Sequence, residues 1–106
     1  MTTLIKNLQK LKKMGATAIK QSLEDEGSSY EDIKNMQKIC KKVGMPLNLK
    51  IGGCEAINDI NFCRLISSNN IIAPMVETKY AFKKFIKNLI MLNSYTKNYF
   101  KNKWEF

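Results

Sequence analysis

Three times along this chain, a lysine-rich helical pattern ends at a turn and is followed by a short apolar stretch. The apolar stretches cover residues 17–23, 46–51 and 70–76, and each closes on a carboxylate or a glycine pair. Helical patterns that alternate with short strands are typical of βα units on a parallel sheet. Because ligands bind at the carboxyl ends of such strands, the repeat also indicates where a functional site would lie.

The length of the chain limits how many such units it can contain. Its 106 residues allow one domain with three to four βα units. A closed barrel of eight units takes about 250 residues, so we expect a small open α/β sheet or a part of a larger one. We expect the domain to cover residues 1–92. In residues 93–106, aromatic residues alternate with Asn and Lys. We expect these residues to form a C-terminal tail, which could include the beginning of a further strand.

Glycines and hydroxyl side chains mark the predicted ends of the helices. Gly15 and Gly44 follow lysine-rich helical patterns, as C-terminal capping glycines do. Either Ser28 or Ser29 is placed to cap the second helix, and Thr78 is placed to cap the fourth.

The basic charge is spread evenly along the chain. The net charge is +9, with ten basic and five acidic side chains in residues 1–50 and eight and four in residues 51–106. Seventeen of the 18 basic residues are Lys, whereas Arg supplies the forked contacts that read bases and phosphates. Solvated helix faces explain this distribution better than a nucleic-acid interface does.

The cysteine pattern and the hydropathy favour a cytoplasmic protein. The three cysteines show no C-x-x-C spacing, and without any His a zinc site is not expected. Free thiols fit a reducing cytoplasm. No apolar run approaches the ~18 residues of a membrane span, so we expect no membrane association.

Eight of the nine carboxylates lie at or shortly after the end of a predicted strand. Helix dipoles alone explain Glu31, Asp32 and Asp59, because acidic groups favour helix N-termini. The three adjacent carboxylates at 24–26 repel one another, and a divalent cation, the amine of Lys50 or water could offset that repulsion.

Lys50 is the most informative single residue. It ends an apolar strand two residues before Gly52, so its amine should reach the mouth of the sheet, where it can bind a carboxylate or enolate oxygen. The alternative is a lysine that extends into solvent. We expect Glu24, Lys50 and Glu77 to line one rim.

Two further features sit near the same rim. The pair Gly52-Gly53 predicts a tight turn with a close backbone approach. Pro74 is unusual inside a strand and predicts a bulge or an early end of the strand beside Met75 and Glu77.

Three motifs stand out along the chain. They are Gly15-Ala16…Ile19-Lys20…Leu23-Glu24-Asp25-Glu26-Gly27, Pro46-Leu47…Leu49-Lys50-Ile51-Gly52-Gly53-Cys54-Glu55-Ala56, and Ile71-Ile72-Ala73-Pro74-Met75-Val76-Glu77-Thr78…Tyr80-Ala81. In their order and spacing over residues 1–92, these motifs together resemble the hydroxy-oxo-acid aldolase and citrate lyase family.

The resemblance implies a TIM barrel, of which this chain would form about half. It implies a carbon–carbon lyase or aldolase that acts on a 2-oxo acid or an acyl-CoA thioester, with Mg²⁺ or another divalent metal holding the enolate. It also implies an oligomer, or a complementing fragment that closes the barrel.

The same resemblance suggests roles for individual residues. Glu24 and Asp25 match an acidic motif, and Lys50 stands where the family usually has an Arg that polarises the substrate carbonyl. This is a departure from the family pattern, because Lys lacks the forked contact of Arg. The candidate substrate-binding residues are Gly52, Gly53, Pro74 and Met75.

The position of the metal depends on how the third motif is aligned. In the preferred register the motif precedes the strand that bears the metal-binding Glu, so the metal ligands lie beyond residue 106. In the second register Glu77 is itself a metal ligand. Two readings from other classes remain open: a non-catalytic basic module that docks on acidic partners, and a decayed gene fragment without a function.

Overall fold

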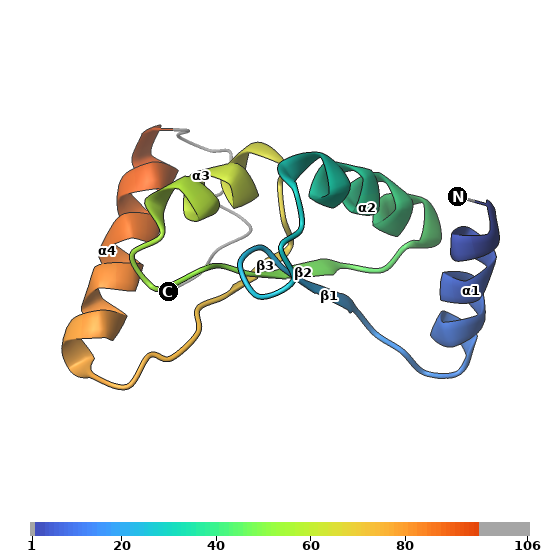
Figure 1. Ribbon diagram of the computed structural model, residues 1–106, viewed down its shortest axis with the longest axis horizontal. Helices are drawn as coiled ribbons and strands as arrows, with labels where there is room; N and C mark the ends of the chain where they lie inside the picture. The colour runs from blue at the N-terminus through green and yellow to red at the C-terminus, as the bar shows by residue number, and fades with distance from the viewer. Residues whose placement is uncertain (1, 96–106) are drawn as a thin grey trace.

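The structure is a computed structural model that describes residues 2–95 as a small α/β unit (Figure 1). Four helices and three strands alternate strictly along the described chain. The elements are α1 (Thr2–Lys13), β1 (Ile19–Ser22), α2 (Tyr30–Val43), β2 (Leu47–Lys50), α3 (Ile57–Leu65), β3 (Asn70–Ile72) and α4 (Lys79–Tyr95).

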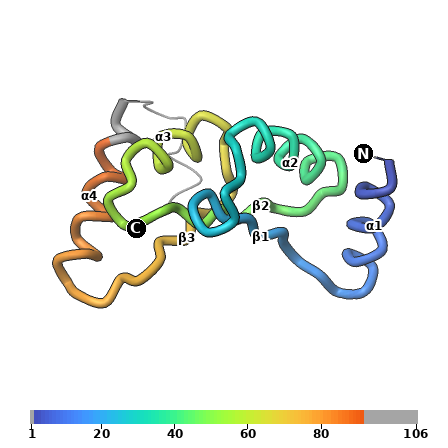
Figure 2. The backbone as a smooth tube through the Cα atoms, in the orientation of Figure 1, coloured from blue at the N-terminus to red at the C-terminus, as the bar shows by residue number. Residues whose placement is uncertain are grey.

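The three strands form one parallel sheet in the order β1-β2-β3. Ile19 pairs with Leu47, and Leu49 pairs with Ile71. The predicted repeat of βα units on a parallel sheet is therefore confirmed for the described residues. The tube in Figure 2 shows the strand order following the chain, with α2 and α3 on the same side of the sheet.

The strands are shorter than predicted at both ends. Residues 17 and 18 precede the ladder, which begins where the amide of Ile19 donates to Pro46 O at 2.9 Å. At the other end β3 stops at Ile72, because Pro74 has no amide to donate and Met75 adopts a φ of +54°. The early end of the third strand that Pro74 predicts is confirmed.

Polar side chains and glycines fix the helix ends. Of the two serines proposed as caps, Ser29 closes a capping box with Asp32 at the start of α2. Gly44 ends α2 with a φ of +78°, a conformation that costs glycine little. Thr78 Oγ1 accepts a hydrogen bond from the amide of Ala81 at 3.0 Å, so the predicted cap of α4 is confirmed.

Helix α4 runs through to Tyr95, past the boundary that we predicted at residue 92. The incomplete strand predicted near the end of the chain lies outside the described residues.

The main core lies between β2 and the helices on one face of the sheet. Leu47, Leu49 and Ile51 alternate along β2 and just beyond it, and none is more than 1% exposed. They pack with Ile33 of α2 and Ile60 of α3 in one cluster. A second, smaller cluster joins α1 to α2 and to Met45, the second residue after α2. Its buried members are Leu8, Ile39, Val43 and Met45.

The opposite face of the sheet is polar. Side chains alternate between the faces of a strand, so the partners Lys20, Asn48 and Asn70 lie on the face away from Leu47 and Leu49. Asn70 Nδ2 donates to Asn48 Oδ1 at 2.8 Å across this face. The sheet thus has one apolar face covered by helices and one polar face.

Among the described residues, none of the helices combines the length and the apolar character that crossing a bilayer requires.

The three thiols differ in access. Cys40 and Cys63 are buried, whereas Cys54 is partly exposed in the loop after β2. Burial raises the pKa of both buried thiols, that of Cys63 to about 12. Since the thiolate is the reactive form, we expect an aromatic disulfide reagent near neutral pH to modify Cys54 quickly and the other two only after unfolding.

The number of fast-reacting thiols checks this prediction. Native protein should show one fast-reacting thiol and denatured protein three, and Cys54→Ser should remove the fast phase. Equal rates for all three thiols in native protein would contradict the burial described here.

Candidate functional site

The candidate site lies at the carboxyl ends of β1 and β2. Lys50 is the last residue of β2, and its Nζ lies 2.5 Å from Asp25 Oδ2 in the loop after β1. The two strands are parallel, so their carboxyl ends meet at one edge of the sheet. Of the three ways in which the repulsion within 24–26 could be offset, the amine of Lys50 is the one that the structure shows.

The ion pair is open to solvent. The side chain of Lys50 is 26% exposed and that of Asp25 is 58% exposed. The hydrogen bond from Lys50, and then its charge, lower the pKa of Asp25 below its ordinary value. Asp25 is therefore ionised at neutral pH.

We expect the pKa of Asp25 to rise when Lys50 is replaced. Lys50→Met removes the hydrogen bond and the charge that lower the pKa of Asp25, so that pKa should return to the ordinary range for Asp. Because the folded-state pKa is lowered, the stabilisation by the pair is present at neutral pH and is lost as the pH falls through that value.

The carboxyl ¹³C shift of Asp25, followed through a pH titration, measures this change. Lys20→Met is the matched control, because Lys20 makes only the smallest of the contributions that lower the pKa of Asp25. An unchanged pKa in Lys50→Met would contradict the contact.

The other acidic side chains in this loop have separate roles. Glu26 Oε1 accepts a hydrogen bond from the amide of Ser22 at 2.5 Å and so folds the loop back over the end of β1. Gly27 allows this turn with a φ of +62°. Glu24 points instead toward the loop after β2, where its Oε2 would lie 3.4 Å from a Cβ placed on Gly52.

The predicted close approach is found at Gly52. The same hypothetical Cβ would lie 3.2 Å from Asp59 Oδ2, and the amide of Gly52 donates to that oxygen at 2.9 Å. Two carboxylates, those of Glu24 and Asp59, therefore flank the backbone of Gly52. A Cβ on Gly53 would contact nothing within 4 Å, so the close approach involves the first glycine of the pair.

Asp59 does more than interact with the dipole of α3, because its carboxylate accepts two hydrogen bonds from other parts of the chain. Besides the amide of Gly52, it accepts a hydrogen bond from Tyr30 Oη at 3.2 Å. The Tyr30 ring stacks on Phe62 with centroids 4.0 Å apart, and burial together with the bond to Asp59 raises the pKa of Tyr30. Asp59 thus joins the start of α2, the loop after β2 and the first turn of α3.

Asp59 and Ser22 lie at this edge of the sheet but were not among the predicted site residues. Asp59 is the third residue of α3 and lies seven positions after Gly52, so a short loop returns it to that glycine. Ser22 is 1% exposed, and its Oγ has no hydrogen-bond partner among the described residues. It pairs in register with Lys50 and shares its face of the sheet, about 4.8 Å away in the backbone.

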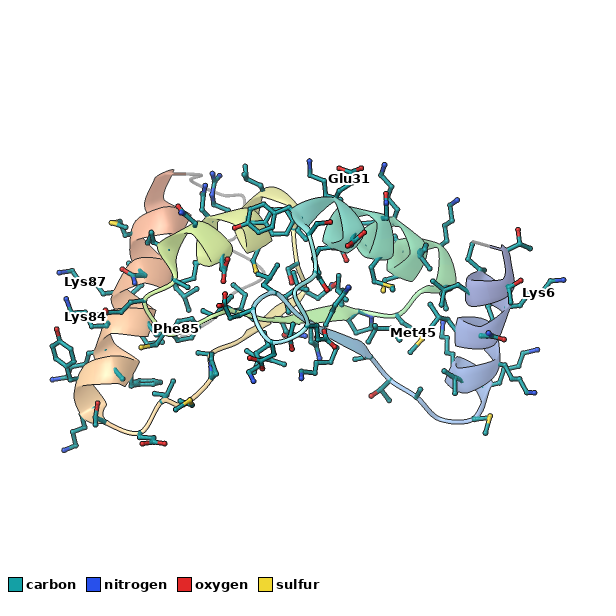
Figure 3. The ribbon with its side chains drawn as sticks, viewed as in Figure 1. Lys6, Glu31, Met45, Lys84, Phe85 and Lys87 are labelled. Atoms are coloured by element: carbon teal, nitrogen blue, oxygen red, sulfur yellow. The ribbon has the colours of Figure 1, made fainter. Side chains whose placement is uncertain are left out.

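An open groove of about 600 Å³ lies beside these residues. It is acidic, because Glu24, Glu55 and Asp59 line it together with the two glycines. Lys84 of α4 approaches Glu55 to 4.0 Å from outside. Figure 3 shows Lys84 and Lys87 on the outer side of α4. The remaining lining residues are Ala56, Ile57 and Asn58.

The residues predicted from the third motif do not join this groove. Pro74 and Met75 follow β3 and are not among its lining residues, and Met75 is 82% exposed. Glu77 is also exposed, and no ion pair or hydrogen bond of its side chain occurs in the described part of the chain. Glu24 and Lys50 belong to the ends of the neighbouring parallel strands β1 and β2, whereas Glu77 does not line the groove beside them.

The described residues do not form a complete site for a divalent metal. Within residues 2–95, no three His, Cys, Asp or Glu side chains gather where they could hold an ion. Glu24 and Asp59 approach each other at Gly52, but Asp59 already accepts two hydrogen bonds, and Asp25 is paired with Lys50.

Comparison with models of protein families, with curated proteins and with solved structures gave no significant match. The resemblance to the aldolase and citrate lyase family stays a prediction from the motifs.

Proposed function

We propose that this chain is part of a βα barrel of the aldolase and citrate lyase type and binds a 2-oxo acid or an acyl-CoA thioester at the ends of β1 and β2. The observation that carries this proposal is the contact between Lys50 and Asp25. Two of the three candidate catalytic residues, distant in sequence, meet at the edge of the sheet where such folds bind ligands.

The architecture is consistent with part of a βα barrel. Strand order follows chain order, and α2 and α3 cover the same face (Figure 1). One half of a doubly wound sheet shares this arrangement, and the two architectures differ only beyond the switch point. With right-handed crossovers, continuation of the order seen here adds each new helix to the outer side of a closing barrel.

Lys50 can bind a substrate oxygen while it stays paired with Asp25. An ammonium group has three donors, Asp25 takes one, and the side chain is partly open to solvent. The charge would stabilise the oxyanion that develops on a carbonyl when the neighbouring carbon–carbon bond breaks or forms. Asp25 would hold the amine in place.

Glu24 completes the proposed site. The hydroxyl of Ser22 lies on the same face as Lys50 but is buried, so we assign it no contact with the substrate. Glu24, beside Gly52, would orient the substrate or its water. We assign no step to a metal here.

Closure of a barrel needs further strands. Among the described residues β1 and β3 are both edge strands, and their unpaired backbone groups can accept a neighbouring strand. The proposed partner is a second copy or a complementing fragment. Light scattering after gel filtration would show whether the purified chain is an oligomer.

Release of pyruvate tests the enzymatic proposal. Purified full-length chain is incubated with Mg²⁺ and oxaloacetate or a 4-hydroxy-2-oxo acid, and pyruvate is measured by coupled oxidation of NADH. The expected result is release above the metal-only background. Release equal to that background, with oxaloacetate and the hydroxy-oxo acid alike, would remove the proposal for the isolated chain.

Unpaired lysines favour one alternative function, a basic module that docks on acidic partners. Lys50 and Lys84 are the lysines with ion pairs in the described part of the chain. Four exposed lysines lie along α2: Lys34, Lys38, Lys41 and Lys42. Binding to heparin that falls steeply with added salt, in a chain without activity on oxo acids, would favour this alternative.

A further inference from the structure

The two edges of the sheet differ in how their backbone groups are satisfied. In β1, the amides of Ile19 and Leu23 donate to β2. Backbone groups alternate in direction along a strand, so Lys20 and Ser22 turn theirs to the open side. Glu26 Oε1 then accepts the amide of Ser22 at 2.5 Å. This contact and the exposed charge of Lys20 together close much of the β1 edge.

The edge at β3 has no such protection among the described residues. Ile72 O accepts a hydrogen bond from the amide of Ile51, directly after β2, at 3.0 Å. The N–H and C=O of the preceding residue, Ile71, therefore point to the open side. Residues 65–76, which include β3, form the longest run without a charged side chain. Charges on an edge strand oppose pairing with another chain, so β3 is the edge that remains available.

We propose that two copies of this chain pair through β3 and form a closed dimer with two-fold symmetry. Identical edge strands related by a two-fold axis run antiparallel, and this pair can be centred on Ile71. The two Ile71 residues then form a hydrogen-bonded pair, in which each amide donates to the carbonyl oxygen of the other copy. The free backbone groups of the edge are thus complementary to themselves.

Glu26 limits the assembly to two copies. A head-to-tail contact would pair β3 of one copy with β1 of the next, and its repetition would give a ring or an open filament. That contact needs the amide of Ser22, which Glu26 already occupies. The two-fold contact needs β3 alone, so it is the one that both edges permit.

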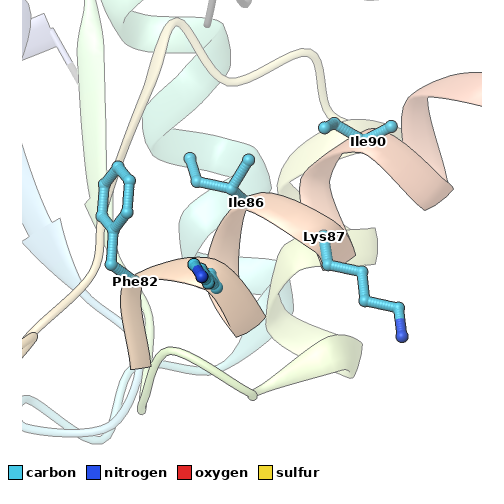
Figure 4. A pocket seen from close by; sticks show the side chains of 5 residues that line it. Phe82, Ile86, Lys87 and Ile90 are labelled. Atoms are coloured by element: carbon cyan, nitrogen blue, oxygen red, sulfur yellow. The ribbon is translucent and has the colours of Figure 1, made fainter. Parts of the chain in front are cut away.

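The net charge favours β3 over an exposed apolar surface on α4. Each copy has a net charge of +9, so two copies repel unless they meet where charge is absent. On α4, Phe82, Ile86 and Ile90 lie along an open hollow of about 320 Å³ (Figure 4). Lys83 and Lys87 also line this hollow, so a second copy would meet like charge there.

The contact is short, so we expect a reversible dimer. Strand β3 has three residues, and Pro74, which has no amide, limits pairing beyond them. The dimer should therefore depend on protein concentration. Added salt should strengthen it, because salt screens the repulsion between the two copies.

The dimer gives the proposed function its partner and rests on that function only in this respect. A fragment that completes a barrel would compete with the second copy for the β3 edge. A chain that dimerises without releasing pyruvate would support the dimer alone. A monomer that releases pyruvate would overturn the dimer and leave the enzymatic proposal standing.

Sedimentation equilibrium of the full-length chain tests the proposal. We expect the average mass to rise with concentration toward twice the 12.2 kDa of one chain. Asn70→Lys places a charge beside the two-fold axis in both copies and should keep the chain monomeric. Asn48→Ala is the matched control, because it also removes the hydrogen bond between Asn48 and Asn70 but leaves β3 uncharged.

Exchange of single backbone amides locates the contact without any substitution. The amide of Ile71 should exchange with solvent more slowly as the protein concentration rises, because pairing gives it an acceptor. The amide of Lys20, which turns to the β1 edge, should exchange at the same rate throughout. Slower exchange at both amides would identify the head-to-tail contact and overturn the two-fold dimer.

Replacing Glu26 tests why the assembly stops at two copies. Glu26→Ala frees the amide of Ser22 and opens the β1 edge, so species larger than a dimer should form. Glu31→Ala removes the same charge from the first turn of α2 and should leave the dimer unchanged. A Glu26→Ala variant that stops at the dimer would overturn the role of Glu26.

Three results would overturn the two-fold contact itself. The first is a chain that stays monomeric at every concentration. The second is an Asn70→Lys variant that dimerises as well as Asn48→Ala does. The third is loss of the dimer in Ile90→Gln, which would place the contact in the hollow on α4.

Discussion

Replacing Leu49 with alanine is expected to lower the free energy of unfolding by about 2–5 kcal/mol, the range for loss of a large buried side chain. Leu49 is completely buried at the centre of the sheet, between β1 and β3, and packs in the main core. Removal of three carbons leaves a cavity that the paired neighbours Gln21 and Ile71 can fill only in part. Urea denaturation followed by circular dichroism measures the effect.

This loss is large relative to the total stability expected of such a chain. The free energy of unfolding of native domains is about 5–15 kcal/mol. The variant should therefore be partly unfolded at modest urea concentrations. Asn48→Ala is the matched control one residue away on the polar face, where only the hydrogen bond with Asn70 is lost, at about 0.5–1.5 kcal/mol. A Leu49→Ala cost no larger than that of the control would contradict the core.

Replacing Lys50 with methionine is expected to lower the rate of pyruvate release by about 10²- to 10³-fold, the usual cost of removing one group that stabilises an oxyanion. Methionine keeps much of the length of the side chain but has no charge and no donor. The proposed substrate oxygen then loses its cation, and Asp25 loses its partner. Initial rates with oxaloacetate measure the effect.

Two further variants separate catalysis from general charge effects. Lys20→Met removes an exposed lysine from the same face of the sheet, two positions before Ser22, and should leave the rate almost unchanged. Lys50→Arg keeps the charge and should retain part of the rate. Equal losses in Lys20→Met and Lys50→Met would show that Lys50 has no special role in the reaction.

Much of the fold could be predicted because its signals are local. The three βα repeats, Ser29 as one of two possible caps, Gly44 and Thr78 follow from residue types at fixed positions relative to helix ends. The strand lengths were less predictable. Residues 17 and 18 are compatible with a strand, but the ladder depends on which partner residues of β2 are available.

The site was predictable only where strand order determines it. Parallel pairing of β1 with β2 brings the loop at 24–26 to Lys50, and this proximity was foreseen. The bond of Asp59 to Tyr30 depends on how α3 packs on α2, which no local pattern reveals, whereas its bond to Gly52 lies within one short loop. Pro74 ends β3 as predicted, yet Met75 and Glu77, which follow it, do not line the groove.

The small cluster that holds α1 has a consequence for how the molecule opens. Helix α1 has a single buried residue, Leu8, and its contacts are with α2 and the segment around it rather than with the main core. Detaching this helix exposes far less apolar surface than unfolding the sheet does, so it costs much less free energy. The N-terminal helix is therefore expected to separate transiently from an intact βα core, and hydrogen exchange would begin there.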